Sequence, residues 1–370
     1  MSRPRAPARK PAAAPAALGY RMPAEWEPHS GTWLAWPHHR GDWPGKLGVV
    51  TWVFGEMIRK IVLGEQARVL AASQAEEQAA RKLLDSIGVD RKKSAFSIIP
   101  TNRAWMRDLG PIFIRREGPS PTLAIAGFRF NAWAKYSDWD LDCLVAGKIA
   151  RGRRVPVFPA DIGGQPVVLE GGSVDVNGRG SVLTTEECLL DPATQVRNPG
   201  TSRQDIEAVL RGWLGVSNVI WLGRGIAGDD THGHVDDLCR FVGPRTVVLC
   251  RETNASDENY RALEENRERL EGARLEDGSR PDAVYLPMPE PLTMNRQRLP
   301  ASYANFYVSN AAVLVPTFND PNDRVALGIL AELFPGRSVV GIHCVDLVWG
   351  RGTLHCLTQQ EPREQAPGRP

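Results

Sequence analysis

The hydrophobic residues of this chain recur with a spacing that changes repeatedly between that of a strand and that of a helix. Short apolar runs at 31–36 and 67–72 predict strands, and apolar positions three or four residues apart over 49–62 predict a helix between them. A second predicted helix, 74–87, ends before Gly88, a residue type common just past a helix C-terminus. The chain therefore begins with a predicted strand–helix–strand unit.

The same alternation continues along the rest of the chain. Short apolar runs between turn-forming residues predict strands at 94–99, 111–114, 122–126, 167–169, 173–176, 181–184, 218–222, 245–250, 283–286, 311–315 and 338–342, the second and third as a hairpin. Helical spacing predicts helices at 140–150, 201–214, 257–270 and 322–334. Roughly five such cycles follow one another without a linker, which predicts one compact α/β domain.

Two of these helices carry recognisable start signals. Thr201 and Gln204 have the spacing of a capping box, in which each side chain satisfies a free backbone N–H at the start of the helix. Asp320 or Asn319 is expected to cap the helix at 322–334, since short polar side chains are favoured there. These signals predict where the two helices begin.

The two ends of the chain lack the alternating pattern. Residues 1–19 are mostly Ala, Pro, Arg and Lys, and prolines interrupt the alanines, so a disordered tail is expected rather than a secretory signal. Residues 363–370 predict a flexible C-terminal tail, which leaves 20–362 as the folded domain. No run of about 18 apolar residues is present, so the sequence predicts no membrane partner.

Composition narrows the class of protein. The 370 residues include 45 Lys and Arg against 43 Asp and Glu, a net charge of +2 that predicts no nucleic-acid partner. The six cysteines form no CxxC pair, which is typical of reduced thiols in the cytoplasm and predicts no zinc site. With 42% hydrophobic residues the chain is long enough for a large core.

Cys356 is the candidate nucleophile. It is set among polar residues, and it follows Gly350 and Gly352, which permit a close approach between a substrate and the backbone. The other cysteines lie in apolar segments, where a thiol usually acts as a small buried hydrophobe; they are Cys143, Cys188, Cys239, Cys250 and Cys344. A lone cysteine after a glycine turn is ordinary, so the acids and the histidine must decide its role.

The segment 228–237 combines two histidines with several carboxylates. If the chain is extended from His234, then His234 and Asp236 point to the same face and could hold one ligand. Such residues are also typical of a metal site, and from these residues alone that alternative stays open. The remaining histidines are scattered without an HExxH arrangement.

Two further acids interrupt the apolar pattern. Asp108 follows Trp105 by three positions just ahead of a predicted strand, and Glu170 lies at a strand end beside two glycines. Each acid in isolation is more typical of an exposed turn.

Seven segments together resemble the agmatine deiminase family of the guanidine-modifying pentein superfamily. They occur in the order of that family between about residues 20 and 362, at 22–28, 105–108, 130–133, 169–173, 233–236, 302–307 and 354–360. The resemblance implies a five-bladed α/β propeller around a central pocket that needs neither a metal nor an organic cofactor.

The resemblance also implies roles for single residues. Cys356 matches the nucleophile, His234 the general acid/base, and Asp108 and Asp236 the two carboxylates that bind the guanidinium. Glu170 and Asn305 match supporting substrate-binding positions. Trp105 is assigned to the pocket wall, where its ring could contact the guanidinium by cation–π attraction; a tryptophan packed in the core is the alternative. A cationic substrate and a nearby His234 are expected to favour the thiolate of Cys356.

Three positions need separate consideration. Arg351 interrupts a turn that is usually an uninterrupted glycine run in the family; it could repel an amine or bind a carboxylate, and a solvent-exposed side chain is expected. Ala134 and Lys135, which follow the segment 130–133, likewise stand where members of the family often have glycines. His355 adjoins Cys356 and is a rival base, but adjacent side chains of an extended backbone point in opposite directions, so packing is the expected role.

The implied reaction is hydrolysis of agmatine to N-carbamoylputrescine and ammonia through a covalent amidino-thioether on Cys356. Within the guanidine-modifying enzymes, the alternatives are a different substrate, either another small guanidine or a peptidyl arginine, or an amidinotransferase reaction. Outside the enzymes, the alternative is a non-catalytic propeller that acts as a binding protein. The implied partner is a small guanidine, and a homo-oligomer is compatible with the sequence.

Overall fold

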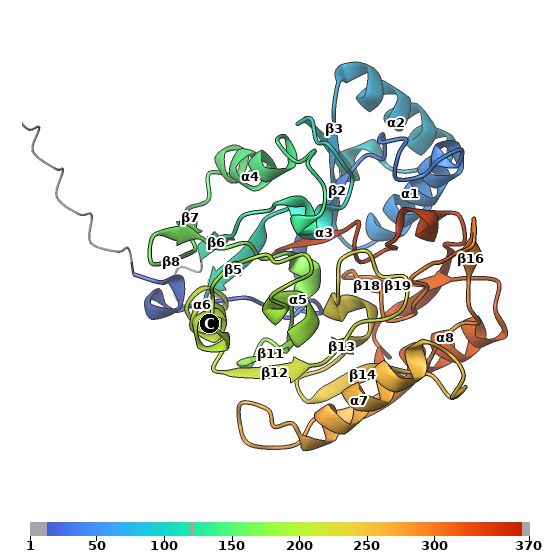
Figure 1. The fold of residues 1–370 in the computed structure, drawn as a ribbon. Helices are drawn as coiled ribbons and strands as arrows, with labels where there is room; N and C mark the ends of the chain where they lie inside the picture. Colours follow the sequence, from blue (N-terminus) through green and yellow to red (C-terminus); the bar gives the residue numbers. More distant parts are fainter. Residues whose placement is uncertain (1–12, 119–121, 365–370) are drawn as a thin grey trace, which may run out of the picture.

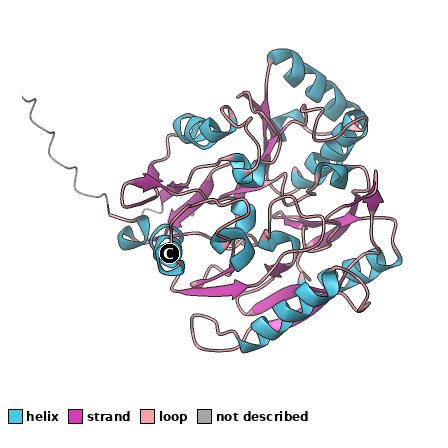
Figure 2. Ribbon diagram, viewed as in Figure 1, coloured by secondary structure: helices cyan, strands magenta, loops and turns pink. Residues whose placement is uncertain are grey.

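The computed structural model describes residues 13–118 and 122–364, and within these ranges the strands form five sheets of three or four strands and two separate hairpins. Figure 1 shows the five sheets around a common centre, with the longer helices outside them. Figure 2 shows the same division into inner strands and outer helices. The predicted α/β fold of five strand–helix–strand units is confirmed.

The sheets are as follows, each in spatial order. The first contains β21 (Gln359–Pro362), β2 (His29–Ala35), β3 (Gln66–Ala71) and β4 (Ser94–Ile98); the second contains β1 (Tyr20–Arg21), β5 (Ile112–Arg116), β6 (Thr122–Gly127) and β7 (Val157–Pro159); the third contains β10 (Asp175–Val176), β11 (Ser181–Thr185) and β12 (Asn218–Leu222); the fourth contains β13 (Cys239–Phe241), β14 (Thr246–Arg251) and β15 (Asp282–Pro287); the fifth contains β18 (Tyr307–Val308), β19 (Ala312–Thr317) and β20 (Ser338–His343). The hairpins are β8 (Asp161–Ile162) with β9 (Gln165–Pro166) and β16 (Thr293–Met294) with β17 (Gln297–Arg298).

Each of the five sheets repeats one topology: an antiparallel pair, a crossover helix, and a parallel third strand. The crossover helices are α1 (Leu47–Ile61), α4 (Val145–Arg153), α6 (Arg203–Leu214), α7 (Asn259–Gly272) and α8 (Pro321–Leu333), and α2 (Gln74–Ser86) leads to the additional strand β4. A parallel pair requires such a crossover because its strands run in the same direction.

The last strand of the chain completes the first sheet. β21 pairs antiparallel with β2, and Thr32 lies opposite Gln360. This pairing brings the segment that carries Cys356 next to the N-terminal sheet, so the two ends of the domain are joined at the centre of the molecule.

The helices form where the apolar spacing predicts them. In α1, residues at helical spacing are buried against the largest apolar cluster; they are Val50, Phe54, Met57, Ile58 and Ile61. The predicted strands and helices are present with small shifts at their ends, except at 167–169, where the structure has only an isolated bridge between Val168 and Arg129. The predicted helix at 140–150 is instead a 3-10 turn, η4 (Asp142–Leu144), followed by α4.

The capping residues of α6 differ from the prediction by one position. Ser202 accepts a hydrogen bond from the backbone N–H of Asp205, and the Asp205 carboxylate accepts one from the backbone N–H of Ser202. The prediction of Thr201 and Gln204 is wrong, because two overlapping capping patterns lie in this segment and a carboxylate in the first turn also interacts favourably with the helix dipole. For α8 the predicted cap Asp320 is confirmed.

The N-terminal part of the folded chain begins earlier than predicted. The 3-10 turn η1 (Pro15–Leu18) packs against α6, and Pro15 is buried, so the prediction of disorder is wrong for these residues. At the other end, the backbone N–H of Arg363 donates to the Pro28 carbonyl at 2.8 Å. The rest of both predicted tails, 1–12 and 365–370, lies outside the described residues.

No helix within 13–118 and 122–364 has the length and apolar character needed to cross a membrane.

Short elements and turns, rather than long helices, lie near the centre of the ring. Figure 1 shows α3 (Met106–Leu109) and α5 (Glu186–Leu190) there, and the other short elements include η5 (Gly171–Ser173), η6 (Val235–Asp237) and η7 (Leu347–Gly350). Of these, α3 and η6 carry the buried charged side chains Arg107, Asp108, Asp236 and Asp237. Buried charges are costly unless they are paired, so this concentration of polar groups marks the centre as the place to look for chemistry.

Candidate active site

The sulfur of Cys356 is held by the turn that follows η7. The Cys356 carbonyl accepts a hydrogen bond of 3.0 Å from the backbone N–H of Arg107, and Asn305 Nδ2 donates to the Cys356 Sγ at 3.2 Å. A Cβ atom added at Gly352 would lie 2.7 Å from the Trp105 ring and 3.2 Å from the sulfur. A glycine is therefore required beside the nucleophile.

Asn305 organises this turn from the opposite side. Its Oδ1 accepts hydrogen bonds from the Thr353 hydroxyl at 2.7 Å and from the backbone N–H of His355 at 3.2 Å. Its Nδ2 also donates to Asp237 Oδ1 at 3.0 Å. The predicted supporting residue Asn305 thus connects the nucleophile turn with the acidic segment around η6.

The four predicted catalytic side chains meet at one place. His234 Nδ1 lies 3.8 Å from Asp108 Oδ2 and 4.0 Å from Asp236 Oδ1. The other Asp236 oxygen, Oδ2, lies 3.9 Å from the Cys356 Sγ. Cys356 is 5% exposed and His234 is fully buried. Asp236 therefore lies between the sulfur and the imidazole.

The backbone around His234 is not the extended strand that was predicted. His234 precedes the 3-10 turn η6, which contains Asp236, and the chain becomes a strand only at β13. The two side chains still lie close together, with His234 Nδ1 4.0 Å from Asp236 Oδ1, although strand alternation is not the reason.

Gly172 provides the space in which the imidazole and the carboxylates approach one another. A Cβ atom at Gly172 would lie 2.5 Å from His234 Nδ1, 3.0 Å from Asp108 Oδ1 and 3.1 Å from Asp236 Oδ2. The backbone N–H of Gly172 donates to Asp108 Oδ1 at 3.0 Å, and Trp133 Nε1 donates to Asp108 Oδ2 at 2.9 Å. Asp108 is thus oriented by two donors that the sequence did not identify.

Glu170 lies on the opposite side of the imidazole. His234 Nε2 is 3.8 Å from Glu170 Oε2, while Arg197 Nε donates to Glu170 Oε1 at 3.1 Å. Burial opposes ionisation of Glu170, but Arg197 and His234 outweigh it and lower the pKa of Glu170 to about 2. The predicted supporting residue is therefore a permanent carboxylate behind the imidazole ring.

The surroundings of the His234 imidazole favour its charged form. Burial lowers the pKa of His234, but Asp108, Cys188 and Glu170 outweigh it and raise the pKa well above its usual value. Burial raises the pKa of Asp108 to about 6; His234 opposes this rise, whereas Asp236 adds to it. His234, a possible proton donor, therefore lies beside Asp108, an acid whose pKa is raised to about 6.

The surroundings of Cys356 favour its neutral thiol. Burial raises the pKa of its thiol well above the usual value, and the carboxylates of Asp236, Asp237 and Asp108 raise it further. Without substrate, therefore, the negative charges around the sulfur prevail over His234; the expectation that the cationic substrate and His234 together favour the thiolate stays a prediction.

The space in front of Cys356 is narrow and opens into a wider hollow. The inner pocket, of about 20 Å³, is lined by Trp105, Asp108 and Cys356 among others, and the outer hollow has about 390 Å³. Both are lined by Trp133, Asp230, Gly350 and Arg351. Trp105 lies in the pocket wall as predicted, while its ring also packs on Trp43 with centroids 5.2 Å apart.

Arg351 lies at the junction of the two hollows rather than free in solvent. Its guanidinium donates to Gln297 Oε1 at 2.6 Å and lies 3.5 Å from Asp230 Oδ1, and Lys135 Nζ reaches the same Asp230 oxygen at 2.7 Å. Arg351 has a φ of 70°, a left-handed conformation that glycine adopts more readily than arginine. The expectation that the Arg351 side chain points to solvent is wrong, because Arg351 and Lys135 both pair with Asp230.

His355 has polar partners rather than the expected packing role. Its Nδ1 lies 2.6 Å from Asp236 Oδ2 and its Nε2 lies 2.7 Å from Glu25 Oε2. Glu25 in turn pairs with Arg107 and Arg240, each at 3.1 Å. The argument from alternating side chains failed because residues 354–357 form a turn.

Several residues of the site carried no predicted role. Glu25 and Trp133 lie in segments that the resemblance had marked, and Asp237 is the neighbour of a predicted acid, so weak signals existed for these three. Arg197 had none, and Cys188 was expected only as a small buried hydrophobe, because their place beside Glu170 and His234 depends on packing alone.

The two histidines of 228–237 do not converge. His232 Nε2 contacts Asp191 Oδ2 at 2.8 Å, whereas His234 faces the pocket acids. Among the described residues, two groups of three side chains bring possible metal-binding atoms within 4.8 Å of one another: Asp236, Asp237 and Cys356, and Glu170, Cys188 and His234.

A ring of five α/β sheets around a buried cysteine, histidine and acids defines a guanidine-modifying enzyme with the pentein fold. A sequence model of the Porphyromonas-type peptidyl-arginine deiminases matches residues 21–362, and this chain belongs to that family.

Named relatives cover nearly the whole chain. Agmatine deiminase of Medicago truncatula is 37% identical, over 93% of this chain and 96% of its own length. The solved agmatine deiminase of Enterococcus faecalis has a TM-score of 0.87 at 32% identity and covers 96% of this chain and 100% of its own. A cysteine-to-serine agmatine deiminase of C. jejuni with substrate bound has a TM-score of 0.82 at 29% identity, over 93% and 97% of the two chains.

Proposed function

We propose that this protein hydrolyses agmatine to N-carbamoylputrescine and ammonia. The observation that carries the proposal is the clustering of Cys356, His234, Asp108 and Asp236, each within about 4 Å of another of the four, beside a narrow pocket that Cys356 and Asp108 line. The names of the relatives, which are agmatine deiminases, support this substrate.

Asp108 and Asp236 would bind the guanidinium. A guanidinium is planar and cationic, and each of its edges can donate to a carboxylate through two charge-assisted hydrogen bonds. Two acids that flank one sulfur therefore select a flat cation and hold its central carbon near the nucleophile. The pocket of about 20 Å³ has to widen for this, since it holds little more than one water molecule.

Substrate binding also supplies the charge that the sulfur needs. The surrounding carboxylates raise the pKa of Cys356, and a guanidinium placed between them offsets their negative charge. The thiolate, which is the reactive form, is then favoured in the complex.

In the first half-reaction the Cys356 thiolate attacks the guanidinium carbon, and a C–S bond forms. The tetrahedral adduct receives a proton from the His234 imidazolium on one terminal nitrogen, and the C–N bond to that nitrogen breaks. Ammonia leaves, and a cationic amidino-thioether remains on Cys356.

In the second half-reaction neutral His234 takes a proton from water as the water oxygen attacks the same carbon. The C–S bond then breaks and returns the thiolate, while the new C–O group loses its proton to solvent and becomes the carbonyl of the ureido product. Glu170 stabilises the imidazolium at each end of the cycle, since its low pKa keeps it ionised. No step uses a metal or a cofactor.

The remaining assignments are proposals as well. A cytoplasmic location is supported by the free cysteines, among which the structure pairs none within the described ranges. The small guanidine is the proposed partner; nucleic acid is not, since the net charge is only +2. The oligomeric state stays a prediction.

The experiment offers the purified protein agmatine, arginine, a peptidyl arginine and other guanidines, and measures ammonia and ureido product together. Equal amounts of both from agmatine are expected. Mass spectrometry of the quenched reaction should find an amidine adduct on the peptide that contains Cys356. Cys356→Ala should lose activity, while the matched variant Cys143→Ala should keep it. Consumption of another guanidine with agmatine untouched would overturn the substrate, and an active Cys356→Ala would overturn the mechanism.

A further inference from the structure

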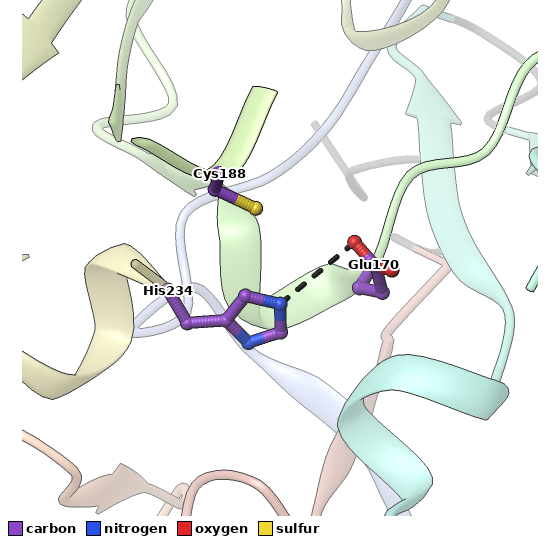
Figure 3. Close-up of side chains that lie close together, drawn as sticks. All are labelled: Glu170, Cys188 and His234. Atoms are coloured by element: carbon purple, nitrogen blue, oxygen red, sulfur yellow. Dashed lines mark ion pairs between the residues drawn. The ribbon is translucent and has the colours of Figure 1, made fainter. Parts of the chain in front are cut away.

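A second thiol lies beside the imidazole of the site. One donor atom each of Glu170, Cys188 and His234 lies within 4.8 Å of the others, and all three side chains are buried. Glu170 precedes η5, Cys188 lies on α5, and His234 precedes η6, so three separate segments contribute. In Figure 3 the Cys188 sulfur lies on the side of the His234 ring that faces the Glu170 carboxylate.

The donor atoms of this group lack ordinary partners. Glu170 Oε2 and both ring nitrogens of His234 are buried without a hydrogen bond. The separation of 3.8 Å between His234 Nε2 and Glu170 Oε2 is too long for a hydrogen bond. It is close to the separation of about 3.3 Å that two ligands have on one tetrahedral zinc ion. Unsatisfied buried groups are rare, so these point to a ligand that they could share.

We propose that Glu170, Cys188 and His234 form a binding site for a thiophilic divalent cation such as Zn²⁺. A carboxylate, a thiolate and an imidazole are all ligands that zinc accepts, and three protein ligands leave a fourth position for water. The two negative ligands offset the charge of the ion. Arg197 occupies Glu170 Oε1 and leaves Oε2 toward the group.

The ion would act against the reaction rather than for it. The ion would bind the His234 ring nitrogen that faces Glu170. An imidazole bound to a metal at that nitrogen cannot alternate between donating and accepting a proton there, as the proposed mechanism requires. The site differs from the nucleophile, whose sulfur adjoins Asp236 and Asp237 instead. The metal-binding site stands without the proposed function; only its inhibitory effect rests on that function.

The sequence predicted no zinc site because its cysteines form no close pairs. Residues 170, 188 and 234 are far apart along the chain, and only the fold brings them together. The proposed site runs against that prediction, which relied on local ligand spacing, because a site assembled from three segments has no such signature.

The test uses Co²⁺, whose bonds to thiolate sulfur give a charge-transfer absorption band in the near ultraviolet. Metal-free protein is titrated with Co²⁺ as wild type and as Cys188→Ser, Cys356→Ser and Cys143→Ser. The band is expected at one Co²⁺ per chain in the wild type, in Cys356→Ser and in the matched control Cys143→Ser. It should be lost in Cys188→Ser.

Other results would overturn the site. A band lost in Cys356→Ser but kept in Cys188→Ser would place the ion on Asp236, Asp237 and Cys356. A wild type without a band, or a band kept in every variant, would also refute the proposal. Circular dichroism establishes that each variant is folded. Should Cys188→Ser fail to fold, Glu170→Gln decides by the same titration, with at least a tenfold weaker binding of Co²⁺ expected and unchanged binding contradicting the site.

The effect on activity is measured separately with Zn²⁺. Zinc should inhibit agmatine turnover by the wild type, and Cys188→Ala should need at least ten times more zinc for the same fractional loss relative to its own metal-free rate. Equal sensitivity of the two proteins would refute inhibition through Cys188. A protein that binds Co²⁺ through Cys188 but has no deiminase activity would refute the proposed function and leave the metal site intact.

Discussion

His355 Nδ1 lies 2.6 Å from Asp236 Oδ2, so the residue next to Cys356 holds the carboxylate that lies between the Cys356 sulfur and the His234 imidazole. The other ring nitrogen, Nε2, lies 2.7 Å from Glu25 Oε2, so the ring is fixed between two carboxyl groups. Asp236 thereby has a fixed orientation, with its second oxygen 4.0 Å from His234. His355 acts as a positioning residue through Asp236.

Replacing His355 should therefore impair the substrate complex without removing any reacting group. His355→Phe is expected to lower kcat/KM for agmatine by about 100-fold, the scale on which a misplaced carboxylate acts. The loss should appear chiefly in KM, because Asp236 is proposed to bind the substrate. The matched control is His343→Phe, at an exposed position of β20. A folded His355→Phe with unchanged KM would contradict the positioning role.

The pH profile of kcat/KM should reveal the raised pKa of Asp108. Asp108 must be ionised to bind a guanidinium, and its pKa is raised to about 6, so activity should fall as the pH decreases through about 6 rather than about 4. Trp133→Phe removes the hydrogen bond from Trp133 Nε1 that favours the Asp108 carboxylate, so the decrease of kcat/KM on the acidic side of the profile should move to higher pH. Trp52→Phe, at an exposed position of α1, should not move it. A limb near pH 4, or one insensitive to Trp133, would refute the assignment.

Gly172 should not tolerate any side chain. The Cβ of Gly172→Ala would lie 2.5 Å from His234 Nδ1, so the ring or the carboxylates must shift, and kcat is expected to fall by about 100-fold or more. Gly328→Ala in α8 meets no atom within 4 Å and should leave activity unchanged while stabilising the helix by up to about 1 kcal/mol. Comparison of initial rates and urea unfolding of the two variants checks both statements. A fully active Gly172→Ala would show that the imidazole is not confined there.

Arg351 should oppose the approach of a cationic substrate. Arg351→Gln removes a positive charge at the junction of the two hollows, and KM for agmatine is expected to fall by about threefold at low salt, with a smaller change at high salt because exposed charges are screened. The control is Arg324→Gln, at an exposed position of α8. Steady-state kinetics at two ionic strengths measures the effect. A rise in KM would mean instead that Arg351 contributes to binding.

Glu25 should matter for stability because it neutralises two buried arginines. Glu25→Gln leaves Arg107 and Arg240 without their shared carboxylate and is expected to lower the free energy of unfolding by about 3–5 kcal/mol, as measured for broken buried ion pairs. Urea unfolding measures the loss, and Glu290→Gln, at an exposed position, is the control. A loss within 0.5 kcal/mol, about the size of an ordinary surface substitution, would contradict the role of the network.

Much of the architecture could be predicted from the order of residues alone. Each strand and helix depends on apolar spacing within one segment, so α1, β3 and α8 were found within a few residues of their positions. The segments with Cys356, His234, Asp108 and Asp236 were also found without a structure, because the residues around each of them form a recognisable local pattern.

Only the tertiary structure decided how these segments act on one another. The bond between His355 and Asp236, the pairing of Arg351 with Asp230, and the position of Cys188 beside His234 join residues whose distance along the chain carries no information about their distance in space. The protonation of Cys356 likewise depends on three carboxylates from other segments and on burial. Local spacing determines secondary structure, whereas contacts and electrostatics arise only when the five sheets close around their centre.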